Sequence, residues 1–465
     1  MFPLPYLSVV LATREMTVAF GHVTGRTEKY FTKCSVDPPF ANPLEWNGID
    51  AWSQCPLLFQ EGNFIRMPGR GTLNTSIHVI LSFFPLAGEA ALKLSSVTII
   101  MQPKVLIITD RSDLAETQLI IGLAALPLPV TVMANDTGPN YRLLLDAGVR
   151  AIPLRLAGRF DRSGTRAIRR ELESGGYTVI YGFNPRAIAC GLRASRGLKV
   201  KVMGYRGVIG NVGLLKPESW ITFLHPRLDR VVCVSRAVQR YFESLGWGPF
   251  KLREGKAVTI YKGHDLSWYE APPADLDSFK FPAGAFVVAC IGRDRPGKGF
   301  ATLIEAMEHV PETSPLHLLL VGELQGNPDL ARRVETSRHR DRIHFAGFRN
   351  DAPQVAGACS ALVLPSESEG LPRVVIEAMA YSRPVVVTEV GGMPELVDDG
   401  VEGFVVPVRH PQALAQALVR LANDPELATW MGECGRQRIE RDFSIESTIR
   451  QTASLIQELT DELKV

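Results

Sequence analysis

The stretch from residue 361 to 388, ALVLPSESEGLPRVVIEAMAYSRPVVVT, constrains the fold of this chain more than any other. An apolar run leads into a Gly and Pro turn, a short helical segment and a second apolar run. Pro365 ends the first run, Pro372 fits the first turn of a helix, and Pro384 marks where that helix is over. The pattern predicts a strand, a helix and a second strand, with a functional turn at the carboxyl end of the first strand.

Two carboxylates frame the predicted helix. Glu369 lies in the turn before it, and Glu377 lies eight positions later within it. The free N–H groups and the positive dipole end of the helix favour an anionic ligand. Because a carboxylate repels phosphate, Glu369 and Glu377 should contact ligand hydroxyls, which leaves phosphate to N–H groups and cations. The turn is therefore predicted to bind sugar together with phosphate. Two solvated glutamates at the helix ends are the alternative.

In four segments the chain resembles the retaining glycosyltransferases of family 4 (group 1). These segments are EGLP at 369–372, EAMA at 377–380, PVVVT at 384–388 and GGMPE at 391–395. The resemblance implies the α/β fold called GT-B, in which two Rossmann-like, doubly wound parallel-sheet domains face a cleft and a C-terminal helix crosses back. It also implies that Glu369 contacts the donor sugar, that Glu377 binds the ribose hydroxyls, and that Gly370 and Leu371 belong to the donor site.

A second turn carries the predicted cations. The strand Phe286–Ile291 runs into GRDRPGKG at 292–299, before a helix at Phe300–Glu308. This turn approaches the P-loop pattern, but Gly299 stands where a P-loop has the Ser or Thr that binds magnesium. The family resemblance instead makes Arg293 and Lys298 a clamp on the donor diphosphate. Two fixed cations can stabilise a departing nucleoside diphosphate without a metal. An exposed basic turn is the simpler alternative.

Alternating strands and helices from Lys104 to Leu245 predict the first doubly wound sheet. Two positions in it depart from the family pattern. The family's glycine-rich loop is replaced by Asp110-Arg111-Ser112-Asp113, and Arg206-Gly207 stands where many members have a His that holds the donor sugar. Arg206 is a candidate contact for an acidic sugar or for the diphosphate, with an ordinary surface charge as the alternative.

We expect four segments: an irregular extension at 1–100, an N-terminal acceptor domain at 101–255, a C-terminal nucleotide-sugar domain at 256–442, and a crossover helix at 443–465. Residues 1–100 hold few charges and lack a sustained helical stripe. We expect this extension to be dispensable, with Met101 as the natural start of translation. An added regulatory or membrane-associating domain is the alternative.

Composition excludes several classes of protein. A net charge of +2 argues against a nucleic-acid binder. The seven cysteines are widely spaced, which favours reduced thiols in a cytoplasmic protein over a zinc site. Asp275-Leu276-Asp277 resembles the D-x-D of metal-dependent glycosyltransferases, but it lies in a Pro-rich linker that follows no strand. We therefore expect no metal and no cofactor.

Six arginines cluster in the first domain: Arg155, Arg159, Arg162, Arg166, Arg169 and Arg170. Such a cluster attracts anionic lipid. Peripheral contact with the inner face of the cell membrane is one interpretation, and a solvated helix face is the other. No run of about 18 apolar residues is present in the sequence.

The predicted activity is transfer of a sugar, with retention, from a nucleotide diphosphate sugar to a hydroxyl acceptor, which includes lipid-linked acceptors and cell-envelope polysaccharide. The catalytic candidates are Arg293, Lys298 and Glu369. Two rivals are a nucleotide-sugar epimerase of the same architecture and a nucleotide-sugar-binding protein that has lost activity.

Overall fold

A computed structural model describes residues 6–12, 15–21, 31–35, 64–68, 75–86, 89–246 and 252–463, with side chains from residue 102 onward. The chain forms two compact units, residues 1–66 with 79–96, and residues 67–78 with 97–465.

The first hundred residues contain strands. One antiparallel sheet has the order β1-β2-β3, and another has the order β4-β5-β6. These strands correct the expectation of an irregular extension. Their sequences are rich in β-branched and aromatic residues, which suits extended chain although no helical stripe is present. The strand bounds are Tyr6–Ala12, Glu15–Gly21, Phe31–Ser35, Phe64–Pro68, Thr75–Leu86 and Glu89–Met101.

The first Rossmann-like domain is built on a seven-stranded parallel sheet with the order β13-β12-β11-β10-β7-β8-β9. The chain enters at β7 and winds outward in both directions, as the alternation of elements predicted. The strands are Val105–Ile108, Val130–Ala134, Arg150–Pro153, Val179–Gly182, Lys201–Arg206, Arg230–Cys233 and Ala257–Thr259. The helices α1 to α6 are Leu114–Ala125, Tyr141–Asp146, Arg162–Gly175, Pro185–Ala194, Pro217–Trp220 and Arg236–Glu243.

The edge strand β13 corrects the expected domain boundary at residue 255. It pairs in parallel with β12 and so belongs to the first sheet, although it lies beyond that boundary. Ala257 packs into the apolar cluster of the first domain, which explains why this segment completes the first sheet.

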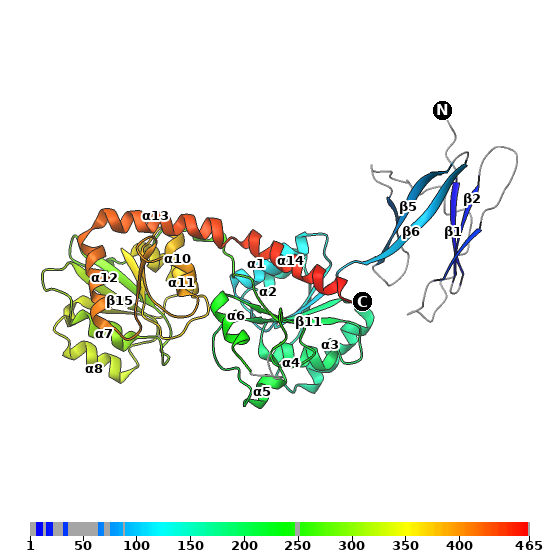
Figure 1. The fold of residues 1–465 in the computed structure, drawn as a ribbon. Helices are drawn as coiled ribbons and strands as arrows, with labels where there is room; N and C mark the ends of the chain where they lie inside the picture. Colours follow the sequence, from blue (N-terminus) through cyan, green and yellow to red (C-terminus); the bar gives the residue numbers. More distant parts are fainter. Residues whose placement is uncertain are drawn as a thin grey trace. The chain divides into compact units, whose positions relative to one another are not determined.

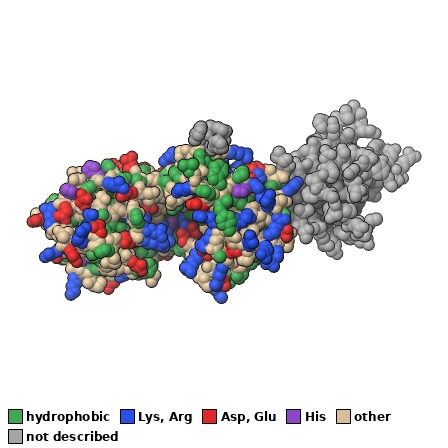
Figure 2. Space-filling model, turned by 90° about the horizontal axis from the view of Figure 1, so that it is seen from below, with side chains coloured by type: hydrophobic (Ala, Val, Ile, Leu, Met, Phe, Trp, Pro, Cys, Tyr) green, Lys and Arg blue, Asp and Glu red, His purple; other side chains and the backbone are tan. Residues whose placement is uncertain are grey.

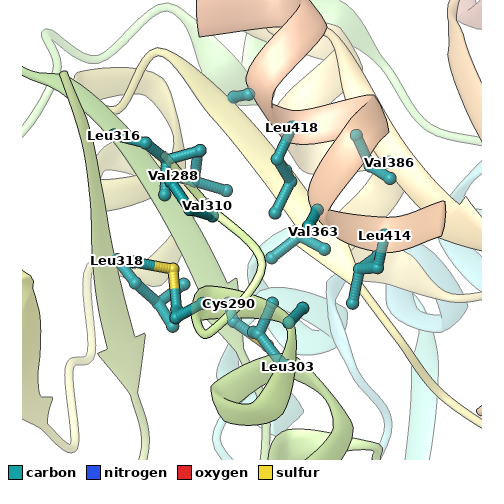
Figure 3. Packing of buried hydrophobic residues seen from close by; sticks show 14 of the residues in the cluster. Val288, Cys290, Leu303, Val310, Leu316, Leu318, Val363, Val386, Leu414 and Leu418 are labelled. Carbon is teal, nitrogen blue, oxygen red and sulfur yellow. The ribbon is translucent and has the colours of Figure 1, made fainter. Parts of the chain in front are cut away.

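The second Rossmann-like domain has a six-stranded parallel sheet with the order β16-β15-β14-β17-β18-β19. Its core lies on both faces of the sheet, and Figure 3 shows one side, where Leu414 and Leu418 of α12 lie over Val363 and Val386. The strands are Phe286–Ile291, Leu316–Val321, Ile343–Gly347, Ala361–Leu364, Val385–Thr388 and Gly403–Val406. The helices α7 to α13 are Phe300–Met307, Pro328–Thr336, Ala352–Ala358, Arg373–Ala380, Met393–Leu396, Pro411–Asn423 and Pro425–Asp442.

The last helix, α14 (Ile445–Asp461), crosses back to the first domain (Figure 1). Ile456 and Leu459 are fully buried in the cluster that contains the first-domain strand β7. Gly122 permits this contact, because a Cβ there would lie 2.1 Å from Cδ1 of Ile449. The predicted crossover is therefore confirmed. In the described part of the chain, no helix is long and apolar enough to cross a membrane.

Candidate active site

The helix α10 carries Glu377 into a buried position behind the turn that follows β17. Glu377 is only 4% exposed, and its Oε1 lies 2.9 Å from Nε of Arg373, one helical turn earlier. Burial raises the pKa of Glu377 to about 7, a shift that Arg373 opposes and Asp113 reinforces. A carboxylate with a pKa so close to neutral is common at functional sites.

Lys298 and Glu369 meet across two loops. Nζ of Lys298 lies 2.6 Å from Oε1 of Glu369, and their side chains are 28% and 13% exposed. Gly299, the N-cap residue of α7, makes this approach possible. Its φ is +74°, and a Cβ there would lie 2.0 Å from the carbonyl oxygen of Pro365. The position that lacks the P-loop hydroxyl is thus also the position where the two loops touch.

Arg293 follows β14 at the edge of the same turn. Its side chain is exposed, and within the described residues it has no hydrogen-bond or ion-pair partner. The structure therefore places Arg293 in the loop of Lys298 without joining the two side chains. A free guanidinium at the end of a parallel strand is available to a ligand.

Backbone packs tightly around the loop that follows β17, residues 365–372, which we call the predicted donor loop. A Cβ at Gly370 would lie 2.1 Å from the carbonyl oxygen of Gly207, and one at Gly391 would lie 1.8 Å from that of Glu369. Leu371 packs against apolar clusters of both domains. Gly370 and Leu371 therefore lie where the two domains touch, next to Glu369.

Arg206 is held by its own loop. It is 8% exposed, its Nε donates to the carbonyl of Val208 at 2.9 Å, and its terminal nitrogen donates to that of Gly210. The guanidinium lies 5.0 Å from the ring centroid of Phe223, and burial lowers the pKa of Arg206. These contacts favour a structural role over the predicted donor contact, because the donors point at backbone.

Sequence reasoning missed a cluster of charges around Lys262, in the segment that joins the two domains. Its Nζ pairs with Asp113 and lies 3.2 Å from Oε1 of Glu116. Asp113 and Glu116 also form a capping box at the start of α1. The signal was present in the sequence as an Asp followed three positions later by Glu.

The structure also describes the Asp275–Asp277 motif and the arginine cluster, two features for which the sequence left alternatives open. Asp277 begins a short 3₁₀ helix, and its backbone N–H donates to Oδ1 of Asp275 at 2.7 Å. Among the described residues, no three His, Cys, Asp or Glu side chains gather as they do around a metal ion.

On α3, Arg162, Arg166 and Arg170 are exposed at intervals of four residues.

Two family models match successive parts of the chain. Residues 117–268 match Glycosyltransferase Family 4, and residues 285–424 match Glycosyl transferases group 1. The chain belongs to the group 1 glycosyltransferases. The two matches confirm the resemblance to glycosyltransferases of family 4 and group 1 that the four sequence segments indicated. Retention stays a prediction.

Among relatives of this group 1 glycosyltransferase is the lipopolysaccharide core biosynthesis glycosyltransferase LpsE of Rhizobium meliloti, 28% identical over 47% of this chain and 61% of LpsE. The UDP-Gal:alpha-D-GlcNAc-diphosphoundecaprenol alpha-1,3-galactosyltransferase of Escherichia coli is 28% identical over 41% of this chain and 51% of that enzyme. The chain spans less than two thirds of the length of either relative.

The structure of Anabaena HepE in complex with UDP superimposes with a TM-score of 0.62, at 24% identity, over 76% of this chain and 100% of HepE. The predicted GT-B fold is therefore confirmed.

Proposed function

We propose that this protein transfers a sugar from a nucleoside diphosphate sugar to a hydroxyl acceptor, with retention at the anomeric carbon. The proposal rests on one juxtaposition. Lys298 and Glu369 pair at the ends of β14 and β17, while the next helix carries the buried Glu377. The site thus combines a cation for the diphosphate with carboxylates for hydroxyls.

Each residue takes a distinct role in this proposal. Glu377 accepts hydrogen bonds from the two ribose hydroxyls, and Glu369 binds hydroxyls of the donor sugar. Lys298 and Arg293 face the diphosphate, which gains negative charge as it leaves, so the two cations stabilise the transition state more than the ground state. The GlcNAc-diphosphoundecaprenol named for the Escherichia coli relative and the lipopolysaccharide core biosynthesis named for LpsE support a sugar or lipid-linked hydroxyl acceptor.

Exposed arginines on α3 support an additional contact with anionic membrane. Arg162, Arg166 and Arg170 are exposed and have no ion-pair partner within the described part of the chain. Figure 2 shows Lys and Arg side chains spread among hydrophobic ones on the first domain, viewed from below. Each charge near an anionic surface contributes about 1 kcal/mol.

Co-sedimentation with phosphatidylglycerol vesicles tests this contact. Binding should weaken with salt and fall when the three arginines become Gln. The matched control is Arg332→Gln with Arg333→Gln on α8, where both arginines pair with Asp329. Equal binding by the two variants would favour a solvated helix face.

A thermal-shift panel of nucleotides and nucleotide sugars tests the main proposal. A ligand at 100 times its dissociation constant should add about 2.7 kcal/mol to the free energy of unfolding. Glu377→Ala should remove most of this stabilisation, because hydrogen bonds to a charged group contribute about 1.5–3 kcal/mol each. Glu440→Ala, on the exposed face of α13, is the control. No shift with any nucleotide would refute the proposal.

A further inference from the structure

The first helix turn of α6, in the first domain, is capped from the second domain. The backbone N–H groups of Arg236 and Ala237 donate to the carboxylate of Glu395 at 2.8 and 2.7 Å. The next N–H, that of Val238, donates to Oγ of Ser235 at 3.3 Å. N–H groups at a helix start have no partner within the helix, so a carboxylate there is strongly favoured.

The same helix start also contacts the predicted donor loop. The hydroxyl of Ser235, which is fully buried, donates to the carbonyl oxygen of Gly370 at 2.9 Å. That carbonyl belongs to the residue directly after Glu369. A Cβ at Gly392 would lie 2.1 Å from the same oxygen, so the peptide of Gly370 is fixed between the two domains.

The segment that joins the two domains also contacts Glu395, through Tyr261. The hydroxyl of Tyr261 donates to Oε2 of Glu395 at 2.9 Å, and the Glu395 side chain is 12% exposed. Glu395 therefore connects α11, α6 and the segment between the domains. Any rearrangement that separates the second domain from α6 breaks the bonds of Glu395 and the bond between Ser235 and Gly370.

We propose that Ser235 and Glu395 are positioning residues. They hold Glu369 in register with the reacting sugar through the start of α6, so the site is complete only when the two domains are in this arrangement. This inference rests on the proposed transfer reaction. It assigns neither residue to the ribose subsite, because Glu377 lies on α10 and shares no bond with them.

Two substitutions at Ser235 separate positioning from helix capping. Ser235→Gly and Ser235→Ala both remove the bond to Gly370, but Gly at a helix N-cap is tolerated much better than Ala. Glu395→Gln removes the negative charge of the carboxylate that caps α6 from the second domain. Ser244→Ala is the control, since Ser244 lies at the opposite end of α6 and its hydroxyl donates to Tyr241.

The measurement separates turnover from nucleotide affinity. Turnover is the release of nucleoside diphosphate from the nucleotide sugar that most stabilises the wild-type protein, and affinity is the calorimetric dissociation constant of UDP, GDP or ADP. We expect turnover to fall about tenfold in Ser235→Gly, Ser235→Ala and Glu395→Gln, since small displacements of a catalytic group have large effects on rate. The dissociation constant should change by less than about twofold, because the ribose subsite is untouched.

Several outcomes would overturn the inference. Unchanged turnover in Ser235→Gly would remove Ser235 from positioning. A much larger loss in the Ala than in the Gly variant would assign the effect to helix capping. Parallel losses of turnover and nucleotide affinity would indicate a general structural role. Ser235 and Glu395 act through the same helix start. The fold loss of turnover in the double variant should therefore be smaller than the product of the fold losses in the two single variants.

Amide hydrogen exchange provides a readout that needs no ligand. The peptide that covers residues 369–371 should exchange faster in Ser235→Gly than in the wild-type protein, and Ser244→Ala should leave it unchanged. If the wild-type protein binds no nucleotide, the proposed function fails. The exchange rates then still decide whether Ser235 holds the loop.

Discussion

Nζ of Lys298 lies 2.6 Å from Oε1 of Glu369, so the cation predicted for the diphosphate and the carboxylate predicted for the donor sugar form an ion pair. The pairing is compatible with both predictions, because an ammonium group has three N–H donors and can bind a carboxylate and a phosphate oxygen together. In the proposed reaction, Lys298 would contact the diphosphate while Glu369 contacts the sugar attached to it, so Glu369 would lie beside the bond that breaks.

Replacement of Lys298 should affect turnover more than donor affinity. In Lys298→Met the diphosphate loses a cation that matters most when negative charge develops, and Arg293→Ala should act in the same direction. The measurement is kcat beside the dissociation constant of the donor. The control is Lys199→Met, at an exposed position of the first domain. Weaker donor binding with intact kcat would remove both residues from the catalytic role.

Donor binding should strengthen as pH rises from 6 to 8. Burial raises the pKa of Glu377 to about 7, and only the ionised carboxylate accepts both ribose hydroxyls. Arg373, Asp113, Tyr269 and Tyr381 are the ionisable groups that face it.

The ligand for this measurement is a nucleotide sugar, whose diphosphate diester does not titrate in this range. The dissociation constant should fall by up to about tenfold per pH unit below the pKa. Glu377→Gln should abolish the dependence. A dependence that survives in this variant would assign the titration to another group.

Stability should show the opposite trend with pH. The folded pKa of Glu377 lies above its ordinary value, so between that value and about 7 the folded protein binds a proton that the unfolded chain has released. The free energy of unfolding contributed by this group therefore falls as pH rises through that window. Urea titrations at pH 5 and pH 7.5 measure it, and Glu377→Gln should reduce the difference between the two. If the difference in the free energy of unfolding between the two pH values is as large in Glu377→Gln as in the wild-type protein, Glu377 is not the group that titrates.

Much of the fold follows from the sequence because buried parallel strands are long apolar runs that local pattern detects. Residues 361–388 form β17, α10 and β18 as predicted, with Glu369 in the loop before α10 and Glu377 within it. The edge strand β13 was assigned to the wrong domain, because a run of three residues does not tell which sheet it joins. The sequence alone leaves Arg206 a candidate ligand contact, because the carbonyls of its own loop that accept its hydrogen bonds have no sequence signal.

The contacts between the domains could not be predicted. Ser235 and Gly370 are 135 positions apart, and Arg236 and Glu395 are 159 apart. Ser235 is a residue type that local rules favour at a helix N-cap, but those rules cannot supply its second partner. Propensity and periodicity describe one element at a time, whereas these bonds depend on how two finished domains meet.

Chelation should leave activity intact. Lys298 and Arg293 can balance the charge of the departing diphosphate, so we expect turnover to persist in EDTA. Turnover measured with EDTA and then with added manganese tests this. Loss in chelator and recovery with manganese would indicate a metal. Asp275→Asn and Asp277→Asn, in the exposed linker, would then show whether the D-x-D holds it.

Lys262 should contribute strongly to stability through the charges it compensates. Its Nζ pairs with Asp113 and lies 3.2 Å from Glu116, with side-chain exposures of 17%, 31% and 16% for the three residues. Burial disfavours a charged Lys262, but Tyr205, Glu116 and Asp113 together raise its pKa. Lys262→Met would leave two carboxylates without their cation at the start of α1. We expect a loss of about 2–3 kcal/mol, less than for a fully buried pair because Asp113 is partly exposed.

The companion variant decides the cause of this loss. Lys262→Met combined with Asp113→Asn and Glu116→Gln removes the uncompensated charges, so it should recover part of the stability that Lys262→Met loses. Asn still serves as a helix N-cap, which limits the damage to α1. Urea unfolding, with Lys199→Met as the control, measures each variant. If the triple variant is less stable than Lys262→Met alone, Asp113 and Glu116 stabilise the protein mainly through their capping box at the start of α1 and not through their pairing with Lys262.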